Sequence, residues 1–228
     1  MSWFRFFLRR AVLVLVVLPM VCNVCARSRY CLSYDDFMAD NWIEIPDVSW
    51  TERNLSAKFW WGGSDYKLKT DDSELEKILN KKAFAVMKDS TLLINTNKMA
   101  LNGYLLGKGY TEARRIRKGK LFFVSAPTDG ESQVATAQFW GGMAAAAMVR
   151  EKQIKNPLCY IVSHGPLDKN GHISVRLVND TQMGLWLINQ QDLYNLYMSE
   201  KKESKRLRAS HIVPILEQAG ILPEGKSF

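Results

Sequence analysis

The sequence predicts an α+β fold, in which an antiparallel meander sheet carries an alanine-rich packed helix and ends in a helical C-terminal tail. Three observations lead to this class. Short apolar runs alternate with glycines between residues 83 and 125, as strands joined by tight turns require. Asn170-Gly171 is a strong hairpin-turn signal, because both positions tolerate positive φ. After residue 179, apolar side chains recur at helical spacing.

The N-terminus has the three parts of a secretory signal. Arg5, Arg9 and Arg10 precede an uncharged apolar stretch, and small residues follow at Val24-Cys25-Ala26. We therefore expect a signal peptide over residues 1–26 and a single α+β domain over residues 27–228. The alternative is an uncleaved anchor, but the apolar stretch is shorter than the roughly 20 residues of a membrane span. The expected location is the periplasm, the outer envelope or the extracellular space.

Composition and charge narrow the class of partner. The chain of 228 residues is 47% hydrophobic, which indicates a folded globular protein rather than a disordered one. Its formal net charge is +8, and three of the arginines lie in the signal, so the excess in the remaining chain is modest. Basic runs at 114–120 and 201–208 are typical of solvated faces. Nucleic acid is not an expected partner of an exported chain with this charge.

Local signals place the elements of the first half. Ser33, with Asp36 three residues later, predicts a capped helix that ends near residue 39. Alternation over 42–45 predicts a strand. Residues 71–81 predict a helix with one apolar face, capped by Asp72 or Ser73. Strands at 83–87 and 91–95 flank a turn, and residues 46–70 carry mixed signals.

The second half continues with strands and then helices. Strands are expected at 103–106, 110–117, 120–125, 158–164 and 173–178. Asn179 or Asp180 can cap a helix, and two further helices are expected over 192–202 and 210–219.

The segment Val134–Gln153 has the most unusual composition, with four consecutive alanines after Gly141-Gly142. Helix propensity is high, and Gly141 and Ala145 would stack on one smooth face. The segment predicts a core helix packed closely on the sheet. The alternative is a membrane-associated protein that uses residues 134–149, although this stretch is short for a span.

Two cysteines, Cys31 and Cys159, remain after the signal. An oxidising compartment permits a disulfide between them. The alternative is two free thiols, with Cys159 a small buried hydrophobe and Cys31 near a mobile end.

Two regions offer candidate functional residues. His164, His172 and Asp168 surround the predicted hairpin turn, and two histidines with a carboxylate could support acid–base chemistry or hold a metal. Trp60 and Trp61 adjoin glycines, with Tyr66 nearby, and exposed aromatics in such a loop could stack on a sugar or grip a partner. Either set could instead be structural.

Sequence motifs of known catalytic or cofactor sites are missing. No G-x-S-x-G, Walker A, H-E-x-x-H or EF-hand pattern is present. Gly107-Lys108-Gly109 lacks the strand-to-helix context of a phosphate loop. We therefore expect no resident cofactor and no metal centre.

The order of features resembles that of small secreted proteins of the Bacteroidota that form a domain of unknown function. The residues that carry this resemblance are AFAVMKDSTLLIN, the GG and AAAA helix, and CYIVSH with HISVRLVND. The resemblance implies a Gram-negative envelope location and transfers no site residue.

Together these observations predict an exported envelope or secreted protein, more readily a non-enzymatic binding module than an enzyme. Its partner would be an envelope component, a glycan or a protein. One alternative is an exported hydrolase or metal-dependent enzyme around the 159–178 hairpin. The other is the membrane-associated protein described above.

Overall fold

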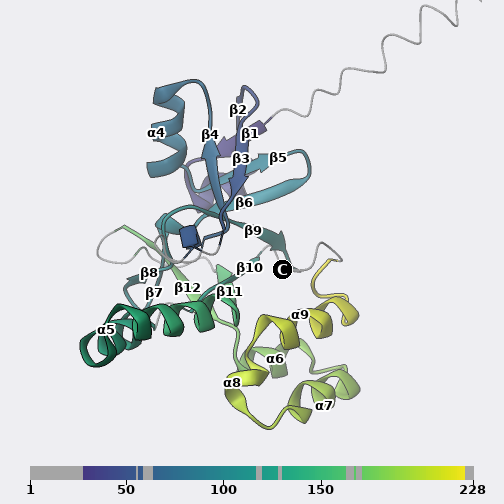
Figure 1. Ribbon diagram of the computed structural model, residues 1–228. Coiled ribbons are helices and arrows are strands. Elements are labelled where there is room, and N and C mark those ends of the chain that lie inside the picture. Colours follow the sequence, from purple (N-terminus) through teal and green to yellow (C-terminus); the bar gives the residue numbers. More distant parts are fainter. Residues whose placement is uncertain are drawn as a thin grey trace, which may run out of the picture.

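The computed structural model describes residues 28–54, 56–58, 64–116, 120–127, 130–162, 167 and 171–223. The expected signal over residues 1–26 lies outside this part of the chain. Helices combine with a large, mostly antiparallel sheet (Figure 1), which confirms the α+β class.

The described residues form a sheet of 12 strands, most of them short. They are β1 (Ser28–Cys31), β2 (Ile43–Ile45), β3 (Ser49–Glu52), β4 (Tyr66–Lys69), β5 (Ala85–Lys88), β6 (Thr91–Asn95), β7 (Met99–Leu101), β8 (Tyr104–Leu105), β9 (Tyr110–Arg115), β10 (Leu121–Ser125), β11 (Leu158–Val162) and β12 (Ile173–Leu177). Their order is β2-β1-β5-β6-β9-β10-β11-β12-β7-β8, and the β3–β4 hairpin joins β9 from the side.

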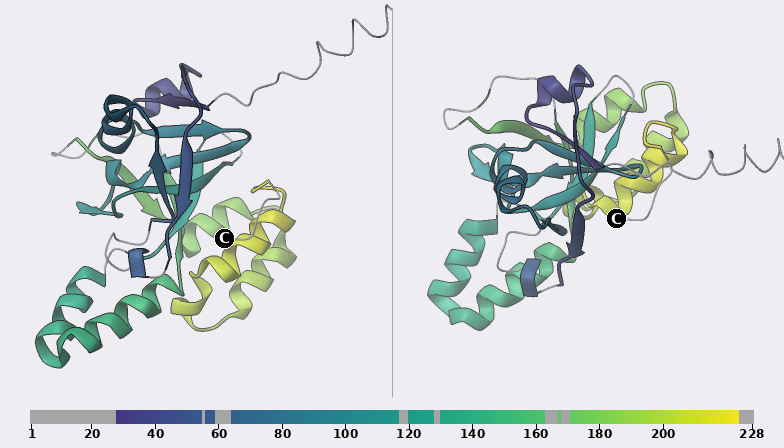
Figure 2. Two further views of the ribbon diagram at one scale, coloured as in Figure 1. Left: turned by 45° about the horizontal axis from the view of Figure 1, so that its top comes forward. Right: turned by 90° about the horizontal axis from the view of Figure 1, so that it is seen from above.

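The helices lie around this sheet and not between its strands (Figure 2). They are α2 (Tyr34–Met38), α4 (Ser73–Lys81), the short 3₁₀ helix η2 (Thr96–Lys98), α5 (Gly130–Ile154), α6 (Asp180–Trp186), α7 (Gln191–Ser199), α8 (Glu203–Arg206) and α9 (Ala209–Gln218).

Capping side chains fix the helix starts that the sequence predicts. The Ser33 hydroxyl accepts a hydrogen bond from the Asp36 amide at 3.0 Å, and the Asp36 carboxylate accepts one from the Ser33 amide at 3.1 Å. This is the predicted capping box. Asp72 accepts from the Glu74 and Leu75 amides and begins α4.

The strand order departs from a simple meander at β7. This strand follows β6 through η2 and then pairs in parallel with β12, Met99 lying opposite Ile173. From β5 to β12 the remaining neighbours are antiparallel, for example Val86 opposite Leu93. The sheet is therefore mixed.

The central strands β10 and β11 are buried on both faces. On one face, Phe122, Val124, Cys159 and Ile161 pack with side chains of α6, α7 and α9. On the other, alternate residues such as Phe123 and Tyr160 pack with α2 and β1. A third cluster lies beneath α4. Alternation along a strand explains the separation, because successive side chains point to opposite faces.

The C-terminal helices are joined by a half-buried ion pair. Arg206 donates to the Asp180 carboxylate through Nε at 3.0 Å and Nη2 at 2.6 Å. Tyr197 donates its hydroxyl to the same carboxylate at 2.6 Å. The arrangement ties α8 and α7 to the start of α6.

The alanine-rich helix is packed only in part. Ala146, Arg150 and Gln153 are buried, whereas Gly141, on the face that the sequence predicts to pack closely, is exposed. Gly142 has φ 69° and ψ −169°, which breaks α5 into two arms (Figure 1). Phe139, Met143 and Met148 are 80%, 56% and 72% exposed. The physical reason is that a glycine pair kinks the helix, while small alanines supply little apolar volume for a core.

The described residues contain no helix that is long and apolar enough to cross a membrane.

Candidate functional site

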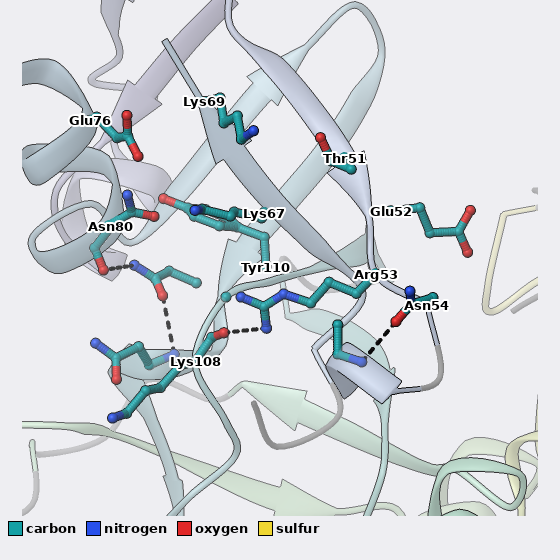
Figure 3. Close-up of a pocket in the computed structure, with 14 residues that line it drawn as sticks. Thr51, Glu52, Arg53, Asn54, Lys67, Lys69, Glu76, Asn80, Lys108 and Tyr110 are labelled. Carbon is teal, nitrogen blue, oxygen red and sulfur yellow. Dashed lines mark hydrogen bonds between the residues drawn. The ribbon is translucent and has the colours of Figure 1, made fainter. Parts of the chain in front are cut away.

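The β3–β4 hairpin leaves the sheet as a fork, and a pocket of about 720 Å³ lies at this fork. Among the residues that the structure describes, β4 meets β9 at one pair, Tyr66 opposite Tyr110. Side chains from β3, β4, α4 and the loop before β9 converge around the space (Figure 3). Its lining comprises Thr51, Glu52, Arg53, Asn54, Ala57, Lys67, Lys69, Glu76, Asn80, Asn95, Asn97, Lys108, Gly109 and Tyr110.

Two buried side chains build the floor by satisfying the last turn of α4. The final carbonyls of a helix have no partner within the helix itself. Asn95 Nδ2 donates to the carbonyls of Leu79 at 3.2 Å and Ala83 at 3.0 Å, and the Tyr110 hydroxyl donates to Leu79 at 2.6 Å. Asn95 Oδ1 in turn accepts from the Asn97 amide at 3.1 Å. The floor is therefore held in place before any ligand arrives.

A second network fixes the wall beneath the β3–β4 hairpin. Arg53 Nη1 donates to the Ser64 hydroxyl and to the Lys108 carbonyl, and Ser64 donates to the same carbonyl at 2.9 Å. Burial lowers the pKa of the Arg53 guanidinium, against the opposing effect of Asp65. These bonds hold the loop before β9 against the hairpin.

Gly109 is the residue that permits this close approach. Its φ is +149°, and a Cβ there would lie 2.5 Å from Ser64 Oγ and 2.8 Å from the Tyr66 carbonyl oxygen. A side chain would push the loop away from the wall. The sequence motif Gly107-Lys108-Gly109 thus serves backbone packing, and Lys108 enters the pocket lining.

The rim of the pocket is positively charged. Lys67 and Lys69 are exposed, while Leu68 between them is buried, so both lysines lie on the same face of β4. In the described part of the chain, the side-chain ammonium groups of Lys67, Lys69 and Lys108 have no hydrogen-bond or ion-pair partner. Arg53 adds a fourth cation, against the two carboxylates Glu52 and Glu76.

The aromatic candidates are placed only in part. Tyr66 is half-buried and packs against Trp50, with ring centroids 5.9 Å apart. It supports the hairpin rather than lining the pocket. Trp60 and Trp61 lie outside the described residues.

Of the three residues in the histidine hypothesis, the structure describes His172 alone. His172 lies just before β12 and is half-buried. His164 and Asp168 lie outside the described residues, so the grouping of the three stays a prediction. Within the described ranges, no group of three or more histidine, cysteine, aspartate or glutamate residues is arranged to hold a metal ion.

The two cysteines are free thiols in different clusters. Cys31 is completely buried with α2 and the neighbouring strands, so it does not lie at a mobile end. Cys159 is completely buried on the other face of the sheet, among side chains of the C-terminal helices. Five strand steps separate β1 from β11 along the sheet. A disulfide requires Cα atoms within about 7 Å, so this arrangement provides no bridge.

Sequence reasoning missed the pocket because its residues come from five separate segments. The lysines of β4 are typical of a solvated strand, and residues 46–70 gave mixed signals. The one signal available in the sequence was the pair of glycines that flank Lys108, because closely spaced glycines indicate a turn or a close approach of the backbone.

The fold first defines a class, an α+β protein with a large mixed sheet. A family model matches residues 29–221, and the chain belongs to this family, the family of unknown function DUF6563. A search of curated proteins and a search of solved structures each found no match.

Proposed function

We propose that the protein is an exported, non-enzymatic binding module whose pocket at the β3–β4 fork holds a polar ligand. One observation carries the proposal: a preformed floor and wall surround a space whose rim bears lysine ammonium groups without partners among the residues that the structure describes. Preorganised sites lose less entropy on binding than mobile ones. The volume also falls within the range of small-ligand sites, about 300–1,000 Å³.

Export is the part of this proposal that rests on the N-terminal segment. The basic start, apolar stretch and small residues of the first 26 positions support it. N-terminal sequencing of the protein recovered from outside the cytoplasm tests it. A chain that begins at Arg27 supports cleavage, and a chain that begins at Met1 contradicts it.

A pocket-filling substitution tests the binding role. Asn80→Trp places a large ring in the pocket from α4, and Lys81→Trp makes the same change at a neighbouring exposed position outside the lining. A panel of saccharides, peptides and nucleotides is screened by chemical-shift perturbation against the chain from Arg27 to Phe228. We expect binding that Asn80→Trp abolishes and Lys81→Trp preserves. Binding that persists in Asn80→Trp would place the site elsewhere.

A second candidate function is association with a membrane surface through α5. The observation that favours it is the exposure of the large apolar side chains Phe139, Met143 and Met148, which would lose contact with water at a membrane surface. This role is compatible with the pocket, because the two regions belong to different elements.

A further inference from the structure

The ligand class follows from the balance of charges around the pocket. Four cationic side chains, Arg53, Lys67, Lys69 and Lys108, face two carboxylates, Glu52 and Glu76. Arg53 is engaged with Ser64 and the Lys108 backbone, but the three lysine ammonium groups have no partner within the described residues. An occupant that brings a negative group would supply that partner.

The remaining lining offers both donors and acceptors of hydrogen bonds. Asn54, Asn80 and Asn97 each carry an amide, and Thr51 carries a hydroxyl. The two carboxylates accept hydrogen bonds only. An inorganic anion without a hydroxyl group would leave these acceptors unpaired. A ligand rich in hydroxyl groups can satisfy donors and acceptors together.

The placement of the charges separates two parts of the pocket. Lys67 and Lys69 stand two residues apart on one face of β4, whereas Glu76 and Asn80 come from α4 on the opposite wall (Figure 3). An anionic group therefore has its counter-ions along β4, and neutral hydroxyl groups have amide and carboxylate partners along α4.

We propose, building on the binding role above, that this pocket takes an acidic saccharide, a sugar unit that carries a carboxylate. Lys67 and Lys69 determine specificity for the negative group, and the α4 wall binds hydroxyl groups. The floor of Asn95 and Tyr110 is a positioning element, since both side chains are committed to α4.

Isothermal titration calorimetry with three probes tests the ligand class. The probes are a galacturonic-acid trisaccharide, a neutral galactose trisaccharide and inorganic phosphate. We expect the acidic trisaccharide to bind about tenfold or more tightly than either of the others, and its affinity to fall as salt rises. The double variant Lys67→Gln/Lys69→Gln should weaken it by about tenfold or more. The control is Lys77→Gln, which removes an exposed α4 lysine outside the lining.

The contrary outcomes separate this inference from the binding role. Equal affinity for the acidic and neutral trisaccharides, unchanged by the double variant, overturns the ligand class and leaves a binding pocket. Phosphate that binds as tightly as the acidic trisaccharide overturns the saccharide assignment. Absence of binding by the acidic trisaccharide also overturns the saccharide assignment. The binding role itself fails if Asn80→Trp leaves the affinity of every ligand found in the screen unchanged.

Discussion

The Tyr110 hydroxyl donates a 2.6 Å hydrogen bond to the Leu79 carbonyl, and through it the first residue of β9 holds the last turn of α4. Asn95 donates to the same carbonyl. Two buried donors from different strands therefore share one orphan acceptor of a helix end. The pocket floor depends on this shared acceptor, and the contribution of each hydrogen bond to the free energy of unfolding can be measured.

Loss of either donor should destabilise the fold. Tyr110→Phe removes one buried hydrogen bond and should lower the free energy of unfolding by about 1 kcal/mol. Asn95→Ala leaves several carbonyl groups without this donor and should lower it by about 2–3 kcal/mol. Because each donor partly compensates for the other, the double variant should lose more than the sum. Urea unfolding measures all three. Tyr104→Phe, at an exposed position, is the control, and a Tyr110→Phe midpoint equal to it would contradict the assignment.

Gly109→Ala should destabilise the protein by about 2–5 kcal/mol, because the added methyl group meets Ser64, Tyr66 and Arg53 in a strained backbone conformation. Gly103→Ala is a matched control, since φ there is +85° but nothing lies within 4 Å of the added Cβ. It should cost only about 1–2 kcal/mol of backbone strain. Equal melting temperatures for the two variants would show that the atoms around Gly109 move aside for a methyl group at little energetic cost.

How far the sequence predicts this fold depends on how local each signal is. The bounds of β6 and the cap at Ser33 follow from neighbouring residues, and the structure confirms them. β1, β3 and β4 were missed, because four residues each provide too little alternation to be distinguished from a loop. Helix propensity located α5 correctly but says nothing about what a helix packs against.

The pocket was beyond sequence reasoning for a different reason. Its lining joins residues as distant as Thr51 and Tyr110, and only the fork of β4 from β9 brings them together. A lysine on an exposed strand has the same sequence pattern whether it faces open solvent or a pocket. The His164 and Trp60 hypotheses remain predictions.

The thiols should be unreactive in the native protein. Burial raises the pKa of Cys31 to about 12 and raises that of Cys159 further, so at pH 8 both are protonated, and only thiolates react readily. A thiol-reactive chromophore should label the chain from Arg27 to Phe228 only after denaturation, and then at two sites per chain. Failure to label the denatured chain would show that the cysteines form a disulfide.

Stability in acid should depend on Asp180. Its pKa is held below the usual carboxyl value, first by the hydrogen bond from Arg206 and then by that from Tyr197, against the cost of burial. The stabilisation is therefore complete above the unfolded pKa of about 3.9 and is lost as pH falls through the lower folded value. Asp180→Asn should cost about 1 kcal/mol at pH 7. That difference should shrink in urea titrations below pH 4, and a constant difference would refute the linkage.

The exposed apolar side chains of α5 should bring the protein to a lipid surface. Burying a phenylalanine or methionine side chain stabilises by about 1.5–3 kcal/mol, so Phe139, Met143 and Met148 together support reversible binding. The chain from Arg27 to Phe228 should sediment with neutral and anionic vesicles and remain bound at high salt. Binding that salt abolishes would instead indicate attraction of basic side chains to anionic lipid.

A matched pair of substitutions distinguishes lipid binding through α5 from nonspecific adsorption by any exposed apolar side chain. Met148→Glu and Ile188→Glu each place a charge where an apolar side chain is 72% or 71% exposed, on α5 and just after α6 respectively. Met148→Glu should release the protein from vesicles, whereas Ile188→Glu should not. If neither variant changes sedimentation, α5 is not the lipid contact. If the protein stays in the supernatant but forms dimers that Met148→Glu dissociates, α5 joins two copies of the chain instead.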